Sequence, residues 1–336
     1  MRGGVATPGR MVPPERARLY RIVFGLAAVY NLGFGVWAAL RPESFFDLFR
    51  MAPPRYPEVW QCLGMVVGLY GLLYAHAARH IESARPILLV GLLGKVLGPI
   101  GWLHAVTTGA WPLRTLPLIV FNDVIWWLPF SLFLLEGTRL GERVRAAAPL
   151  ACASLNALAF LALAIGLRHG TEMVPPPDRI AFVEGHPFLW RAGWCMWMAA
   201  ALTLLAFYAW WACRVPSRFA GIAALLVAGA GLCCDLSAES LFVGWLPNDF
   251  ERIQAAGTFL TGGMANGLYT VGGILLTLAT PNLRGGLRTW AWLCWAAGIL
   301  LSVFAFAGSA MGSAVSATAL FLLFCPWVVV AGKALR

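Results

Sequence analysis

The feature that most constrains this chain is a set of ten long apolar stretches, which together take up most of its length. A helix of about 20 apolar residues spans the hydrocarbon core of a bilayer, where backbone hydrogen bonds must close within the protein. Hydrophobic residues make up 60% of the chain and charged residues 12%, so little remains to build a soluble domain. The sequence therefore predicts an all-α, polytopic integral membrane protein. Its spanning helices are expected at residues 19–40, 59–78, 86–106, 116–135, 150–167, 187–212, 218–245, 253–279, 288–307 and 311–332.

Basic residues are unevenly shared between the two sides that ten helices define. The side with both termini and the even-numbered connections holds Arg2, Arg10, Arg16, Arg18, Arg21, Arg79, Arg85, Arg139, Arg143, Arg145, Arg214, Arg218, Arg284, Arg288, Lys333 and Arg336. The other side holds Arg41, Arg50, Arg55, Arg114, Arg168, Arg179 and Arg252. Because basic residues are retained in the cytoplasm, we expect both termini to be cytoplasmic.

The same distribution bears on partners and location. The formal charge of +10 reads as a topology signal, helped by attraction to anionic membrane lipids, so no nucleic-acid partner is expected. Arginine greatly outnumbers lysine, which is typical of a GC-rich bacterial genome, so the inner (plasma) membrane of a bacterium is the expected location. The oligomeric state is left open.

The N-terminal residues 1–15 are rich in Gly, Pro and Arg, and we expect a disordered cytoplasmic tail there. No A-x-A cleavage pattern follows the first apolar stretch, which therefore reads as an uncleaved anchor.

The most charged connection after the tail, Glu136–Pro149, divides the helices into four and six. This cut predicts a four-helix membrane domain over residues 16–140 and a six-helix membrane domain over residues 150–336. A cut in the loop Arg168–Pro187 gives five plus five instead, and an odd repeat length is the plan of inverted-repeat transporters. The sequence shows no repeat between those halves, and both divisions stay open.

The first apolar stretch is followed by Arg41-Pro42-Glu43-Ser44-Phe45-Phe46, and the second contains Leu63-Gly64, Gly68 and Gly71. In these residues the segment 16–140 resembles the DoxX-like group of four-helix membrane domains. The resemblance implies a four-helix bundle, and some members of that group are linked to quinone-coupled redox chemistry. No redox residue of this chain matches, and the resemblance does not extend to residues 150–336.

Two residues of the first four stretches are candidates for buried charges, Lys95 about midway through the third and Asp123 about two turns into the fourth. A charge at the centre of a spanning helix costs about 2.5–3.5 kcal/mol on insertion scales, so such residues face a partner or a cavity. Adjacent antiparallel helices bring the lysine within reach of the carboxylate. Either an ion pair that holds the bundle together or a site for a ligand or proton fits this pattern.

A richer group lies in the last six stretches. Asp235 and Glu239 stand at i and i+4, which places both carboxyl groups on one helix face about 6 Å apart along the axis. We expect Arg191 to contact Glu239, leaving Asp235 free to bind a proton, a cation or a small-molecule ligand. With Asn266 and Tyr269 nearby, the prediction is a polar cavity that opens to the outside, and a purely structural network is the alternative.

Other chemistry has no support in the sequence. The eight cysteines contain no C-x-x-C pair, and no P-loop, dinucleotide fingerprint, nucleophile elbow or haem-attachment motif is present. We therefore expect no metal and no cofactor, and catalytic residues stay unknown.

Three classes of function remain. The buried charges on glycine-interrupted helices favour transport or binding of a small solute. The carboxyl pair and the DoxX-like segment also fit a membrane-embedded enzyme that acts on a lipid or quinone. The third class is a structural or assembly subunit, in which each buried charge serves packing.

Overall fold

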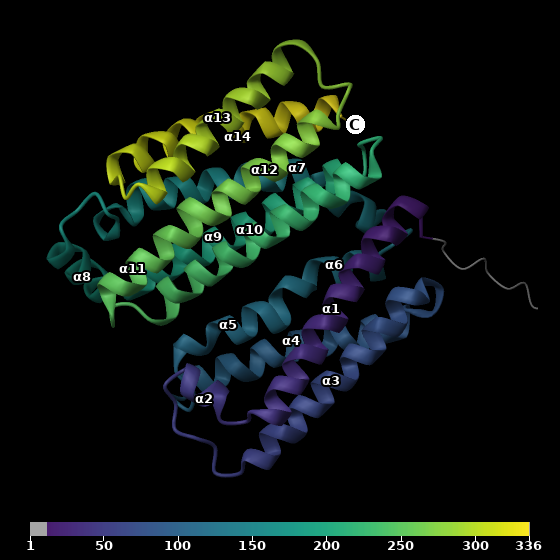
Figure 1. Cartoon of the computed structure of the whole chain (residues 1–336), viewed down its shortest axis with the longest axis vertical. Coiled ribbons are helices and arrows are strands. Elements are labelled where there is room, and N and C mark those ends of the chain that lie inside the picture. Colours follow the sequence, from purple (N-terminus) through teal and green to yellow (C-terminus); the bar gives the residue numbers. More distant parts are fainter. Residues whose placement is uncertain (1–11, 336) are drawn as a thin grey trace, which may run out of the picture. The chain divides into compact units, whose positions relative to one another are not determined.

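The computed structural model describes residues 12–335, and every regular element among them is a helix. Ten segments are long and apolar enough to cross a membrane (Figure 1), which confirms the prediction of an all-α, multi-pass membrane protein. Seven of these segments are single helices, and the first six along the chain are α1 (Pro14–Leu40), α3 (Pro57–Arg79), α4 (Arg85–Thr107), α9 (Pro187–Ala212), α10 (Arg218–Gly244) and α13 (Gly285–Phe306). The seventh single helix is α14 (Ala310–Ala334).

The other three spanning segments each contain a π-helical stretch. The fourth comprises η2 (Leu113–Thr115), α5 (Leu116–Ile119), the π-helix η3 (Val120–Val124) and α6 (Ile125–Leu134). The fifth joins α7 (Arg139–Leu161) to the π-helix η4 (Ala162–Gly166). The eighth joins α11 (Phe250–Thr258), the π-helix η6 (Phe259–Ala265) and α12 (Asn266–Leu278). Such wider turns hold an extra residue and recur at functional sites.

Helix starts follow the local sequence. Pro14, Pro57 and Pro187 occupy the first position of their helices, where the missing N–H costs nothing and the fixed φ suits the helix. Ser217 and Ser309 cap α10 and α14 by accepting hydrogen bonds from the backbone N–H groups three residues on.

The structure differs from the sequence prediction mainly outside the apolar stretches. Residues 1–11 of the expected tail lie outside the described residues, but α1 begins at Pro14, so the last two tail residues are helical. The connections contain the short helices α2 (Ser44–Leu48) and α8 (Pro176–Gly185) and the 3-10 turns η1 (Ile81–Ser83) and η5 (Arg168–Gly170). Short amphipathic turns of this kind give no long apolar signal to read.

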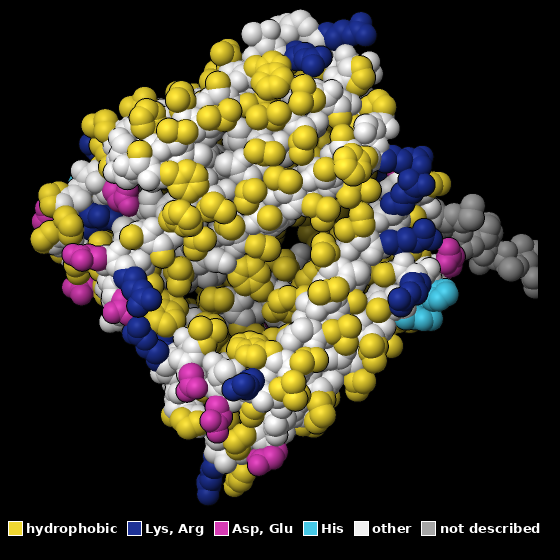
Figure 2. Space-filling model, in the orientation of Figure 1, with side chains coloured by type: hydrophobic (Ala, Val, Ile, Leu, Met, Phe, Trp, Pro, Cys, Tyr) yellow, Lys and Arg dark blue, Asp and Glu magenta, His cyan; other side chains and the backbone are white. Residues whose placement is uncertain are grey.

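The chain forms two compact units, residues 1–145 and 146–336, and the boundary falls inside α7, within the charged connection Glu136–Pro149. In each unit, hydrophobic side chains cover the lengths of the helices, whereas Lys and Arg side chains gather near helix ends (Figure 2). That pattern is the one expected of helices surrounded by lipid.

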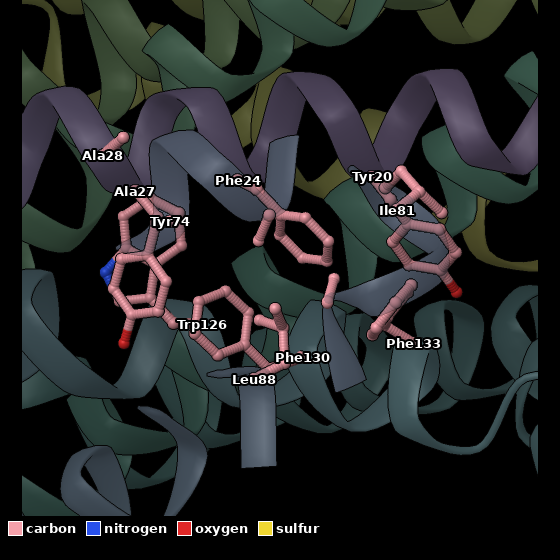
Figure 3. Packing of buried hydrophobic residues seen from close by; sticks show 12 residues of the cluster. Tyr20, Phe24, Ala27, Ala28, Tyr74, Ile81, Leu88, Trp126, Phe130 and Phe133 are labelled. Atoms are coloured by element: carbon pink, nitrogen blue, oxygen red, sulfur yellow. The ribbon is translucent and has the colours of Figure 1, made fainter. Parts of the chain in front are cut away.

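The core of the first unit is an aromatic cluster between α1, α3, α4 and α6 (Figure 3). Phe24 contacts Phe130 and Phe133 edge to face, with ring centroids 5.8 and 5.0 Å apart. Helix α1 also approaches α3 closely, since a Cβ added at Gly35 would lie 2.7 Å from the carbonyl oxygen of Gly64. Small residues at such crossings are a common means of packing helices in membranes.

An ion network ties together the ends of α1, α6 and α7 in the first unit. Glu136 is only 2% exposed and accepts hydrogen bonds from Arg16 (2.6 Å), Arg145 and the hydroxyl group of Tyr20 (2.9 Å). Because the carboxylate is fully partnered, this network reads as a structural clamp.

Candidate functional site

The second unit contains an elongated cavity of ≈ 440 Å³, lined by residues from all six of its spanning segments. Along α9 the lining runs from Trp190 to Tyr208, 18 residues apart, which corresponds to about 27 Å of helix. That length is close to the thickness of the hydrocarbon core, about 30 Å. We call this space the Asp235 cavity, after the carboxyl side chain that lines it from α10.

Aromatic side chains form most of its wall. Trp190, Trp194 and Trp197 follow one another at i, i+4 and i+7 on α9, so all three lie on one face of that helix. The ring centroids of Trp194 and Phe242 are 4.4 Å apart. The remaining aromatic lining residues are Phe160, Tyr208, Tyr269, Trp295, Phe321 and Phe324.

Asp235 lies on α10, nine residues before its last residue, or about 14 Å inside the helix end. It is 6% exposed, and each carboxylate oxygen accepts one hydrogen bond. Thr261 donates to Oδ1 at 2.5 Å and the Tyr269 hydroxyl donates to Oδ2 at 3.3 Å. Both donors are neutral, and no ion pair to Asp235 occurs among residues 12–335.

The π-helix η6 explains how both donors reach one carboxylate. Thr261 and Tyr269 are eight residues apart, so in a regular α-helix their directions would differ by about 80°. The wider turn of η6 accommodates one extra residue between them, which brings the two side chains to the same face. Spacing rules for a regular helix therefore miss Thr261 as a partner of Asp235.

Asn266 lines the cavity, as predicted, but its amide group takes part in helix packing. Its amide donates to the carbonyl oxygen of Gly298 (2.7 Å) and to the hydroxyl group of Ser302 (2.9 Å), both on α13. The small residues on the same face of this segment also contact α13, because a Cβ added at Gly273 would lie 2.4 Å from the Trp295 ring.

The predicted contact between Arg191 and Glu239 is wrong. Arg191 is exposed and does not line the cavity, because it lies about 100° around α9 from its neighbour Trp190, which does. It is also near the start of α9, where a long basic side chain reaches the helix end.

Glu239 is completely buried and lies one turn beyond Asp235 on α10, but it does not line the cavity either. Neither of its carboxyl oxygens has a hydrogen-bond partner among the described residues. An ionised carboxylate without donors is costly to bury. The cavity is thus less polar than predicted, with one carboxyl group in its interior instead of two.

The lining also includes residues from the connection after α7, which sequence reasoning missed. Arg168 and Glu172 of this connection line the cavity, and the Thr258 hydroxyl group donates to Glu172 at 2.6 Å. Nearby on α8, Arg179 is 7% exposed and its guanidinium lies 5.0 Å from the centre of the Phe250 ring. Burial lowers the pKa of Arg179, and the Glu172 carboxylate opposes that shift.

Several polar groups of the lining residues have no partner in the described part of the chain. These are the indole N–H groups of Trp194 and Trp197 and the side-chain oxygen of Gln254. Buried polar groups are ordinarily hydrogen-bonded, so these three groups are exceptions among the described residues.

In the first unit, the structure brings Lys95 and Asp123 together. Their Nζ and Oδ1 atoms lie 4.0 Å apart, and the residues are 5% and 3% exposed. The Lys95 ammonium donates to the backbone carbonyl of Asn122, and the Asn122 amide donates to Asp123 at 2.8 Å. Asp123 lies in the π-helix η3, which turns its carboxylate toward α4, 3.1 Å from a Cβ added at Gly98.

The surroundings of Lys95 are aromatic and closely packed. Its Nζ atom is 6.0 Å from the centre of the Tyr74 ring and 5.9 Å from that of Trp126. Neither Lys95 nor Asp123 lines the Asp235 cavity, and the two form a closely packed ion pair. Among residues 12–335 no three His, Cys, Asp or Glu side chains form a group that could hold a metal ion.

Comparisons of this chain with known proteins found no relative. The chain matches no protein-family model, no curated protein and no solved structure. The resemblance of residues 16–140 to the DoxX-like group stays a sequence-based hypothesis.

Proposed function

We propose that the six-helix unit of this membrane protein binds a small solute in the Asp235 cavity, as a carrier or transporter does. The observation that carries the proposal is the cavity itself, which is bordered by six spanning segments and follows α9 over about 27 Å. A volume of ≈ 440 Å³ lies within the range of small-molecule sites, about 300–1,000 Å³.

The polar groups of the lining support binding over a purely structural role. A structural network satisfies its own donors and acceptors, as Glu136 does in the first unit. In the cavity, by contrast, the indole N–H groups of Trp194 and Trp197 have no protein partner among the described residues. A ligand with an oxygen acceptor would satisfy them once the indole rings turn their N–H groups toward the cavity.

The same geometry supports binding over acid–base catalysis. Both oxygens of Asp235 already accept a hydrogen bond, and Glu239, the second carboxyl of the predicted pair, does not line the cavity. Hydrolytic and isomerising sites ordinarily use a second positioned acid or base.

Filling the cavity tests this proposal. Ala317 lines the cavity from α14, and Val315 on the same helix is 62% exposed. We expect Ala317→Trp to weaken binding of a neutral aromatic probe, 2-phenylethanol, by about tenfold or more in calorimetric titrations of the chain in lipid nanodiscs. Val315→Trp adds the same side chain to the outer surface and should bind as the wild type does. Equal affinities for all three proteins would contradict the proposal.

A further inference from the structure

We infer that the Asp235 cavity selects an organic cation, a ligand that carries a positive charge on an apolar body. This inference rests on the proposed function and names the class of ligand. It follows from the charge of the lining, the composition of the wall and the shape of the space.

The charge of the lining is unbalanced. Only three of the lining residues are Asp, Glu, Lys or Arg. These are Asp235 on α10, and Arg168 and Glu172 in the connection after α7. The last two carry opposite charges, so the Asp235 carboxylate is left without a counter-charge. Thr261 and Tyr269 donate hydrogen bonds to it but supply no charge. Burying a carboxylate is favourable only with a cation or ample donors nearby, and a cationic ligand supplies the missing charge.

The wall suits a cation as well. Tryptophan and tyrosine faces attract positive charge through the ring quadrupole, with tryptophan the strongest. Trp190, Trp194, Trp197 and Trp295 line the cavity, together with Tyr269, whose hydroxyl group donates to Asp235. An anionic ligand would meet both the carboxylate and these electron-rich faces.

The shape points to an organic ion. A bare metal cation prefers several oxygen ligands at short range, whereas the described residues offer one carboxylate and two hydroxyl groups here. A space of ≈ 440 Å³ with aromatic walls fits an apolar body attached to the charged group.

Three probes that share one body separate charge from shape: phenethylammonium, 2-phenylethanol and 3-phenylpropanoate. At pH 7 an alkyl amine is protonated, so the three are a cation, a neutral molecule and an anion. Titrations with the full chain in nanodiscs should show phenethylammonium binding about tenfold or more tightly than 2-phenylethanol, and 3-phenylpropanoate binding most weakly.

Two variants complete the experiment. Asp235→Asn should abolish the preference for the cation while 2-phenylethanol still binds, which also shows that the variant is folded. Glu184→Gln, which removes an exposed carboxylate on α8, should keep the preference.

The failures are distinguishable. If 2-phenylethanol binds as tightly as phenethylammonium and Ala317→Trp weakens both, the binding cavity stands and the inference of a cation is overturned. A cation preference that survives Asp235→Asn overturns it too. If none of the three probes binds, or Ala317→Trp changes nothing, the proposed function and this inference fall together.

Discussion

At the scale of single residues, the four side-chain carboxyl groups that are buried among residues 12–335 are held in four different ways. Glu136 has two arginine partners, Asp123 has one lysine at 4.0 Å, Asp235 has two neutral donors, and Glu239 has none among the described residues. Their roles should differ accordingly, because the cost of burying a carboxyl group depends on its partners.

The Lys95–Asp123 pair should behave as a structural unit. Replacing one member leaves the other charge buried and alone, which costs about 3–5 kcal/mol, whereas replacing both removes that penalty. We expect Lys95→Met and Asp123→Leu each to lower the melting temperature strongly, and the double variant to recover most of the loss. Thermal unfolding of the three variants measures this coupling. Additive losses in the double variant would show that the two side chains act independently.

Glu239 should be dispensable for folding. Because its oxygens accept no hydrogen bond from the described residues, Glu239→Met removes a buried polar group without stranding a donor. We expect the melting temperature to stay the same or to rise. In Asp235→Leu, by contrast, Thr261 and Tyr269 lose their acceptor, at a cost of about 1–3 kcal/mol per unsatisfied donor. A large loss of stability in Glu239→Met would mean that its carboxyl has a structural partner.

At the scale of helices, the apolar stretches predicted the spanning elements well. The predicted range 187–212 coincides with α9, and 218–245 exceeds α10 by one residue. Long runs of apolar side chains determine where a chain can cross lipid, so their limits are readable. The π-helices η3 and η6 are not readable in this way, because an extra residue in one turn leaves hydrophobicity unchanged.

This limit explains which site residues were predicted and which were missed. Asp235, Tyr269, Lys95 and Asp123 attract notice because ionisable or polar groups are rare inside spanning helices. Thr261 does not, since its role depends on the register that η6 creates. The error on Arg191 has a similar origin, because depth along a helix is readable from sequence but the direction of a side chain relative to a neighbouring helix is not.

The register of η6 can be tested by deletion. Removing Phe259, the exposed first residue of η6, should convert the π turn into a regular helical turn and leave α12 in place. Val271 is a comparably exposed residue of α12, a regular helix that contains no extra residue. Removing Val271 therefore rotates the residues on one side of the deletion by about 100° relative to those on the other. We expect the first variant to keep a cooperative thermal transition and the second to lose it. Equal damage from the two deletions would argue against a π turn at this position.

At the scale of the whole molecule, the ten spanning segments make the chain a multi-pass membrane protein, and its orientation is a prediction from the basic residues. In a cysteine-free background, Met173→Cys in the connection after α7 should react with an impermeant thiol reagent from outside the cell. Asn282→Cys, between α12 and α13, should react only after the membrane is permeabilised. Both positions are exposed in the structure. The reverse pattern would invert the topology.

The central claim is that the six-helix unit encloses a space that a small molecule can enter. The most direct measurement is the reaction rate of a single cysteine at Ala317 with methyl methanethiosulfonate, with and without Leu204→Trp, since both positions line the cavity. We expect the Ala317→Cys thiol to react readily and Leu204→Trp to slow that reaction by about tenfold or more. An Ala317→Cys thiol that does not react, or one whose rate is the same with and without the added tryptophan, would contradict the existence of an accessible Asp235 cavity.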